Sequence, residues 1–107
     1  MSILSDYMLD KTVIQTRKAS NTGNSVEAWA DVVTGLKMAI YPASSMSIAN
    51  FQSPFTNIRF SHLGYCLTTA ATFQVGDRVV HGSIIYAVLE VRIWDGDYLY
   101  ELKMGIV

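Results

Sequence analysis

Two histidines and a single cysteine are the side chains of this 107-residue chain best suited to nucleophilic or metal chemistry. His62 and Cys66 stand four residues apart in a segment that alternates like a strand, which separates them by about 13 Å along one face. At that distance they share neither a proton nor a metal unless Gly64 introduces a bulge. We therefore expect Cys66 to be a small buried hydrophobic residue and His62 to be a hydrogen-bonded surface or core residue.

Carboxylates occur at two further places where chemistry is conceivable. Asp95 and Asp97 flank Gly96, a spacing that suits paired carboxylates or a cation site, although an Asp-Gly hairpin turn accounts for both. Asp77 and Arg78 follow a glycine at the entrance of an expected strand. Either Asp77 caps that turn, or Asp77 and Arg78 contact another chain.

Local motifs of the common active sites do not occur in the chain. It has no glycine-rich phosphate loop, no His-Glu-x-x-His, no Gly-x-Ser-x-Gly and no dinucleotide-binding fingerprint. One cysteine and two histidines are too few for a four-ligand zinc site made of Cys and His alone. We expect no enzymatic activity, no catalytic residues, no cofactor and no bound metal.

The composition indicates one globular domain without a basic field. Hydrophobic residues make up 50% of the chain and charged residues 16%, which is typical of folded chains rather than disordered ones. Eight Lys and Arg against nine Asp and Glu give a net charge of -1, which excludes histone-like or polybasic binding of nucleic acid. Asp6 and Asp10 stand where a secretory signal has cations, and the apolar run Ile84–Leu89 is too short to span a bilayer, so we expect neither export nor a membrane partner.

Hydrophobic residues recur mostly at every second position, which predicts β-strands. The expected strands lie at 12–18, 25–33, 36–40, 58–67, 78–80, 84–93 and 98–104, with turns at 21–24, 76–77, 81–83 and 95–97. We expect Ala30 and Val32 on a buried face and Gly35 at the turn of a hairpin. The pattern predicts an all-β fold: one domain over 1–107, with a small barrel or sandwich of about six to seven antiparallel strands over 11–107 and an arm or short helix over 1–10.

Residues 43–56 interrupt the alternation with fourteen residues that carry no charge. Small polar side chains dominate this stretch, and Pro54 prevents a regular strand. Connections of this length inside a compact domain are uncommon and tend to be functional or disordered. The segment is therefore either a functional loop, or a mobile surface loop or short helix over Ser47–Gln52 that closes the core.

The order of these features along the chain resembles a known family. A strand around Ala28-Trp29 precedes the strand Gly35–Pro42, which ends in proline, and the uncharged loop follows. After the loop come a strand through Ser61-His62 and the stretches Val75-Gly76-Asp77-Arg78-Val79 and Ile85–Val91. From Val26 to Met104 this order is similar to that of the head closure, or stopper, proteins among the head-tail connectors of tailed bacteriophages.

The resemblance implies a structural ring, of twelve or six subunits, in the neck of the virion, assembled in the host cytoplasm. Its partners are the portal or adaptor protein above, the tail or a tail-completion protein below, and double-stranded DNA that passes without sequence readout. The loop Ser44–Thr56 then closes the channel until the tail attaches. The candidates for the channel loop are Ser45, Met46, Ser47, Ile48, Asn50, Phe51, Gln52 and Phe55, and those for contacts between subunits are Tyr7, Trp29, Asp77 and Arg78. Because the loop lacks the acidic residues that the resemblance implies after Pro42, a tail-completion ring that only joins interfaces stays open.

A monomeric barrel that binds single-stranded nucleic acid or a peptide is the alternative from another functional class. It requires Trp29, Tyr86, Trp94 and Tyr98 to be exposed together on one face, where bases can stack. Core packing and hairpin pairing are the competing explanation for these aromatic side chains. Their arrangement in space therefore distinguishes the two functions.

Overall fold

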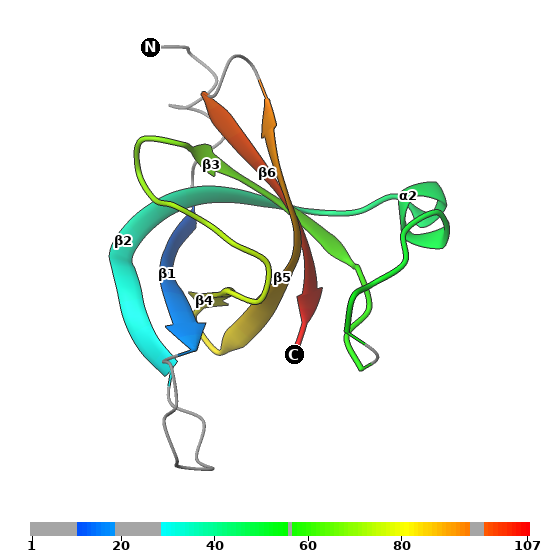
Figure 1. Ribbon diagram of the computed structural model, residues 1–107, viewed down its shortest axis with the longest axis horizontal. Helices are drawn as coiled ribbons and strands as arrows, with labels where there is room; N and C mark the ends of the chain where they lie inside the picture. Colours follow the sequence, from blue (N-terminus) through cyan, green and yellow to red (C-terminus); the bar gives the residue numbers. More distant parts are fainter. Residues whose placement is uncertain (1–10, 19–28, 56, 95–97) are drawn as a thin grey trace.

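Six antiparallel strands close into one small barrel in this computed structural model, which describes residues 11–18, 29–55, 57–94 and 98–107 (Figure 1). The strands are β1 (Lys11–Lys18), β2 (Trp29–Pro42), β3 (His62–Leu67), β4 (Arg78–His81), β5 (Ile84–Trp94) and β6 (Leu99–Ile106), and the short helix α2 (Ser45–Ala49) lies between β2 and β3. Around the barrel the strands follow the order β1-β2-β3-β6-β5-β4. The predicted all-β barrel is confirmed, while the arm at 1–10 and the turns at 21–24 and 95–97 lie outside the described residues.

Strand β2 runs without interruption where we expected a hairpin around Gly35. Gly35 has a φ of 66°, a conformation open to glycine, and it lies at an irregularity in the register between β1 and β2. An extra residue on one strand of a pair bends that strand and increases its twist, so β2 curves around the barrel instead of reversing. The hairpin expected between 25–33 and 36–40 is therefore wrong, and six strands are found.

The bend also changes which side chains of β2 face the interior. Leu36 and Met38, which follow Gly35, are buried, whereas Ala30 and Val32, which precede it, are exposed. The buried face expected for Ala30 and Val32 is therefore wrong. A bulge moves the alternation by one residue, which a strict period of two does not anticipate.

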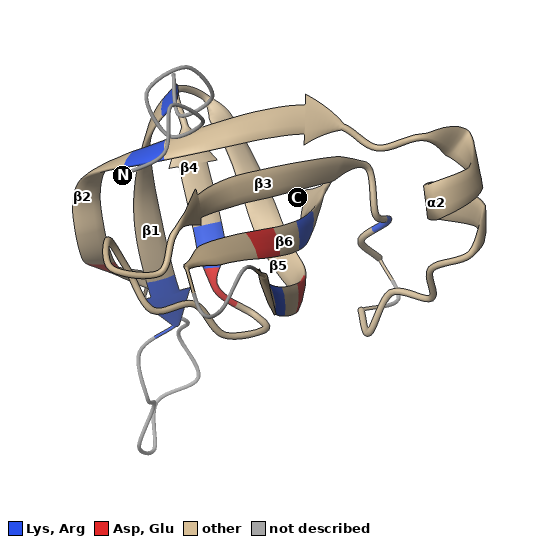
Figure 2. Cartoon of the chain, turned by 90° about the horizontal axis from the view of Figure 1, so that it is seen from above, with Lys and Arg blue, Asp and Glu red and all other residues tan. Residues whose placement is uncertain are grey.

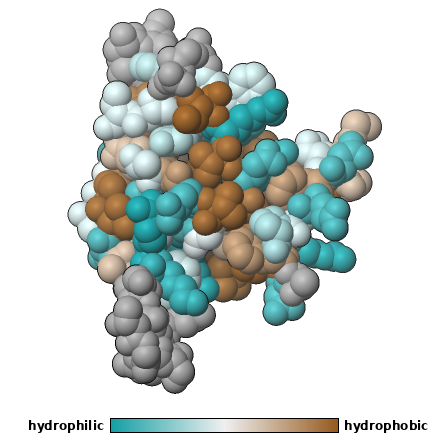
Figure 3. All heavy atoms as spheres, in the orientation of Figure 1, coloured by the Kyte–Doolittle hydropathy of each residue, from teal (hydrophilic) through white to brown (hydrophobic). Residues whose placement is uncertain are grey.

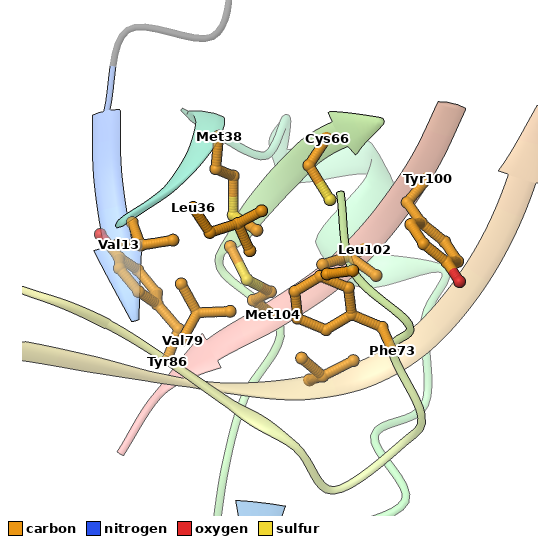
Figure 4. Packing of buried hydrophobic residues seen from close by; sticks show 12 residues of the cluster. Val13, Leu36, Met38, Cys66, Phe73, Val79, Tyr86, Tyr100, Leu102 and Met104 are labelled. Atoms are coloured by element: carbon orange, nitrogen blue, oxygen red, sulfur yellow. The ribbon is translucent and has the colours of Figure 1, made fainter. Parts of the chain in front are cut away.

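Apolar side chains from all six strands fill the barrel (Figure 4). The largest fully buried ones are Met38, Leu102 and Met104. Phe73 comes from the segment between β3 and β4, and its ring packs edge-on against Tyr100 with centroids 5.7 Å apart. In Figure 4 the Phe73 ring lies beside Leu102 and Met104, so the segment that carries it contributes to the core rather than bordering it.

A second, smaller hydrophobic cluster lies where residues 57–61 meet strands β5 and β6. Phe60 packs with Ala87 and Leu89 there, and Ile58 lies against them. The strand expected from Ile58 onward is too long, because β3 begins at His62.

Gly105 on β6 allows the segment 57–61 to approach the barrel closely. Ser61 N donates to Met104 O at 2.9 Å, and an added Cβ at position 105 would overlap the backbone carbonyl of Arg59 and the side chain of Ile58. The backbone of the crossing segment therefore occupies the space that a side chain at position 105 requires.

The turn before β4 is attached to β1 by one buried carboxylate. Asp77 is 1% exposed, and Arg17 holds it through Nε to Oδ1 at 2.8 Å and Nη2 to Oδ2 at 2.9 Å. Gln15 Nε2 and the backbone N–H of Gln74 each donate to Oδ2 at 3.0 Å. Gln15 and Arg17 also donate to the carbonyl of Thr72, at 2.8 and 3.0 Å. The cluster joins residues about sixty positions apart and satisfies both carboxylate oxygens.

Replacement of Gly105 by alanine is expected to destabilise the chain by about 2–4 kcal/mol, because the carbonyl of Arg59 has to move. Gly64→Ala is the matched control, since its added Cβ meets only the flexible ends of Met104 and Met38 and is expected to cost about 1 kcal/mol. Urea denaturation of both variants measures the difference. Equal losses of stability would contradict the close approach at Gly105.

Asp77→Ala is expected to destabilise the chain by about 2–4 kcal/mol, because Gln15 loses a buried acceptor and Arg17 its partner. The control is Glu90→Ala, which removes an exposed pair with Lys103 at 3.5 Å and is expected to cost less than about 1 kcal/mol. The free energy of unfolding in urea compares the two. A cost for Asp77→Ala no larger than that for Glu90→Ala would show that the buried cluster does not hold the turn.

Candidate functional site

The uncharged segment after β2 leaves the barrel as an excursion, defined here as residues 43–61. The β2–β3 pairing ends at Pro42 and His62, and the backbone N–H of Ala43 donates to Ser61 O at 2.9 Å just beyond that pair. Proline has no N–H and cannot continue the ladder, so the two strands separate there. Figure 1 shows the excursion extending sideways from the barrel, with α2 at its far end.

Serine side chains shape the outer part of the excursion. Ser44 is the N-cap of α2, and its Oγ accepts from the backbone N–H of Ser47 at 3.1 Å. Ser53 Oγ accepts from the N–H of Phe55 at 3.1 Å in the turn that follows. No residue of α2 is buried, so these local hydrogen bonds, rather than core packing, order the helix and the turn. Of the two structural possibilities for this loop, a short helix is found, but at Ser45–Ala49 rather than Ser47–Gln52.

Phe51 attaches the excursion to the barrel. Its ring packs edge-on against Phe60 with centroids 5.2 Å apart, and Lys103 Nζ lies 4.9 Å from its centroid. Phe51 is therefore half-buried against the chain's own second cluster. Of the eight candidates for the channel loop, it is the one that the structure turns toward the barrel.

The other seven candidates are exposed: Ser45, Met46, Ser47, Ile48, Asn50, Gln52 and Phe55. Met46 is 74% exposed, and Ile48 and Phe55 are exposed by more than a third. Figure 2 shows no charged residue on α2, and Figure 3 shows apolar and polar side chains side by side over the projecting part. The structure thus places a small, uncharged and partly apolar surface at the end of a projection.

Three of the four candidates for contacts between subunits meet in space, and the fourth, Tyr7, lies outside the described residues. Arg78 lies over the ring of Trp29, with Cζ 4.0 Å from the centroid. Asp77 is directly beside them, but its carboxylate is enclosed by its own chain. The prediction of Asp77 as a direct contact is therefore corrected to a structural role, since it caps the turn and holds Arg17, while Trp29 and Arg78 stay accessible.

Four aromatic residues on which the nucleic-acid alternative depends do not form one exposed face. Tyr86 is buried inside the barrel, and Tyr98 is half-buried. Trp29 begins β2, whereas Trp94 ends β5 at the opposite end of the barrel in Figure 1. Trp94 Nε1 donates to Glu101 Oε1 at 3.0 Å. No stacking surface of these four side chains is present, so this arrangement does not support the alternative.

His62 and Cys66 are separate, as their spacing predicts. Cys66 is fully buried in the barrel core, and burial raises the pKa of its thiol from 9.0 to about 12. His62 Nδ1 lies 2.8 Å from Ser61 Oγ, and its ring packs edge-on against Tyr86. The expected roles of a buried Cys66 and a hydrogen-bonded His62 are confirmed.

Metal-ligating side chains do not gather in the part of the chain that the structure describes. No group of three or more His, Cys, Asp or Glu side chains is close enough there to hold an ion. Asp95 and Asp97, the paired carboxylates of the sequence, lie outside the described residues. Among the described residues, moreover, no helix is long and apolar enough to cross a membrane.

Sequence reasoning missed Gln15 and Arg17, which hold the turn beside the accessible pair Trp29 and Arg78. A glutamine between Val13 and other inward positions of a strand is an unusual core residue and is the one signal present in the sequence. Its partner is about sixty residues away, and spacing along the chain contains no information on that contact.

The buried thiol makes stability depend on pH. Because the folded chain raises the pKa of Cys66 from 9.0 to about 12, the resulting stabilisation is fully present below pH 9 and is lost as the pH rises toward 12. In Cys66→Ala this loss is expected to be smaller, so the stability difference between the two chains narrows above pH 9. Urea denaturation between pH 8 and about 11 measures it. Rapid reaction of Cys66 with a thiol reagent in the folded chain at pH 8 would contradict the burial.

Comparison with protein families and with curated proteins finds no relative of this chain. No model of a protein family matches the chain, and no curated protein matches it. The function therefore has to be argued from the excursion and the barrel themselves.

Proposed function

We propose that this chain is a structural ring component of the head-tail connector of a tailed bacteriophage, and that its excursion closes the DNA channel. One observation carries the proposal: the outer part of the excursion carries no charge and exposes Met46 and Ile48 on α2, which projects away from the barrel. The order of sequence features that resembles the stopper proteins supports the same function. The proposed partners are copies of the chain within the ring, a portal or adaptor ring, a tail protein and the passing DNA.

Exposed apolar side chains on a helix without a core need another surface to stabilise them. Full burial of a side chain the size of Met, Ile or Phe contributes roughly 1.5–3 kcal/mol. Copies of the excursion that converge on the axis of a ring supply such a surface. Because residues 43–56 carry no charge, converging copies do not repel one another.

The same lack of charge suits a channel through which DNA slides. Lys and Arg that line a lumen bind phosphates and release counterions, which favours tight association over passage. The first cation of the excursion is Arg59, outside the uncharged stretch 43–56, and Figure 2 shows no charged residue on α2 itself. An apolar closure therefore blocks the channel by packing and opens without breaking ionic contacts to DNA.

In the proposed mechanism the barrel is the rigid part and the outer excursion is the part that moves. The barrel is closed by hydrogen-bonded strands and filled by its own core. Residues 57–61 of the excursion are packed on the barrel by Phe60 and by the hydrogen bond from Ser61 N to Met104 O. The outer part, which carries α2, is attached to them at the Ala43–Ser61 hydrogen bond and through the Phe51–Phe60 contact. A movement about that base changes the position of α2 without unfolding a strand, which is what an open and a closed state of the channel require.

Substitution of Met46 and Ile48 by serine together is expected to leave the barrel folded but to abolish DNA retention in particles assembled without tails. Val32→Ser with Ile106→Ser is the control, because it removes exposed apolar side chains elsewhere on the barrel. Nuclease-resistant DNA per particle measures retention, and a symmetry-resolved cryo-electron microscopy map locates α2. Full retention in the excursion variant, or α2 directed away from the axis, would overturn the proposed closure.

A further inference from the structure

A second accessible surface lies on the barrel wall, where the starts of β2 and β4 meet the base of the excursion. It is a groove of about 360 Å³. Its apolar wall consists of Trp29, Phe55, Ile58, Val75 and Ala87. Phe55 and Val75 are exposed and Ala87 is buried, so among the described residues the wall is open to solvent at Phe55 and Val75. The groove combines this apolar wall with the guanidinium groups of Arg17 and Arg78.

The two arginines of the groove differ in their interaction partners. Arg17 is bound to Asp77 by two hydrogen bonds, and this contact raises the pKa of Arg17. Arg78 contacts the ring of Trp29 and has no carboxylate partner among the described residues. Contact with an aromatic ring does not satisfy the N–H donors of a guanidinium, which match a carboxylate. The groove therefore has an unsatisfied preference for a carboxylate beside an apolar segment.

The first ten residues of the chain have the complementary composition. They comprise six apolar residues, two aspartates and no Lys or Arg. Their apolar members are Met1, Ile3, Leu4, Tyr7, Met8 and Leu9. Asp6 and Asp10 bracket Tyr7, so a short stretch offers carboxylates and an aromatic ring together. The last ten residues differ, because they contain one acid, Glu101, and one cation, Lys103, and most of them form β6.

Chain geometry favours a neighbouring copy as the source of this segment. β1 begins at Lys11, and its other end, at Lys18, lines the groove. A return along β1 spans about 23 Å at the rise of a strand, out of a maximum reach of roughly 33 Å for ten residues. Only about three residues would then remain to fill the groove of the same barrel. A segment from a second copy meets no such limit.

We infer that residues 1–10 of one copy of the chain bind the groove beside Trp29 and Arg78 of the next copy. The contact joins two different surfaces of the same protein, so it is heterologous and propagates from copy to copy, closing as a ring where the rotation permits. It concerns the chain's own association and holds independently of the proposed role in a phage neck. Where that role applies, it supplies the lateral contact between subunits.

Sedimentation velocity of the full-length chain tests the inference by charge reversal. The wild type is expected to self-associate at low salt and to dissociate as salt rises, because an exposed carboxylate–guanidinium contact is screened. Arg78→Glu, and separately Asp6→Arg with Asp10→Arg, are each expected to weaken association about tenfold or more. A mixture of the two variants is expected to restore association, because the cationic segment of one then meets the acidic groove of the other.

Arg92→Glu is the matched control. Arg92 also lies over a tryptophan, with Cζ 4.4 Å from the ring of Trp94, but it is remote from the groove. This variant is expected to associate like the wild type, and thermal unfolding of all variants checks that each folds. A wild type that stays monomeric up to about 1 mM, equal effects of Arg92→Glu and Arg78→Glu, or no restoration in the mixture would each overturn the inference. These experiments measure association of the chain in solution, whereas the closure is tested by DNA retention in particles with substitutions on α2, so failure of one proposal is distinguishable from failure of the other.

Discussion

The carboxylate of Asp77 is the constraint on which the arrangement of both candidate surfaces depends. It is enclosed between Gln15 and Arg17 of β1 and the backbone of the turn that precedes β4. β4 has four residues, and three of its residue pairs with β1 close the barrel, so ladder bonds alone make this the weakest seam. A buried charge that is fully hydrogen-bonded is costly to separate from its partners, which fixes the seam in one register. Arg78, the next residue, is thereby placed over Trp29.

The excursion has the opposite character. Its helix buries no residue, and the order of its outer part, residues 44–55, comes from the serine cap, the turn at Ser53 and the aromatic contact between Phe51 and Phe60. Few buried contacts mean that local opening there costs less than opening of the barrel. Its exposed apolar side chains are thus available to a partner without unfolding of the barrel, because the barrel is stabilised by its own core.

Alternation along the chain is sufficient to predict an all-β fold and strands close to β1, β5 and β6, because turn residues next to each of these strands mark its ends in the sequence. It failed at Gly35, where a positive φ signals either a turn or a bulge and only the partner strand decides which. The excursion was recognised from its length and lack of charge, but not the position of α2, which Ser44 sets. The contacts of Asp77 depend on residues about sixty positions away, and local spacing does not reveal them.

The two surfaces are physically connected, although different observations point to each. Phe55 belongs to the excursion and lines the groove, and Ile58 packs both on the groove and on the second hydrophobic cluster. A segment seated beside Trp29 therefore contacts the base of the projection that carries α2. If the segment binds the groove more tightly when the excursion is in one position, then binding of the segment stabilises that position by the same free energy, since coupling between two sites is reciprocal. Association between subunits and the position of α2 are thus linked through Phe55, and a partner that displaces one shifts the other.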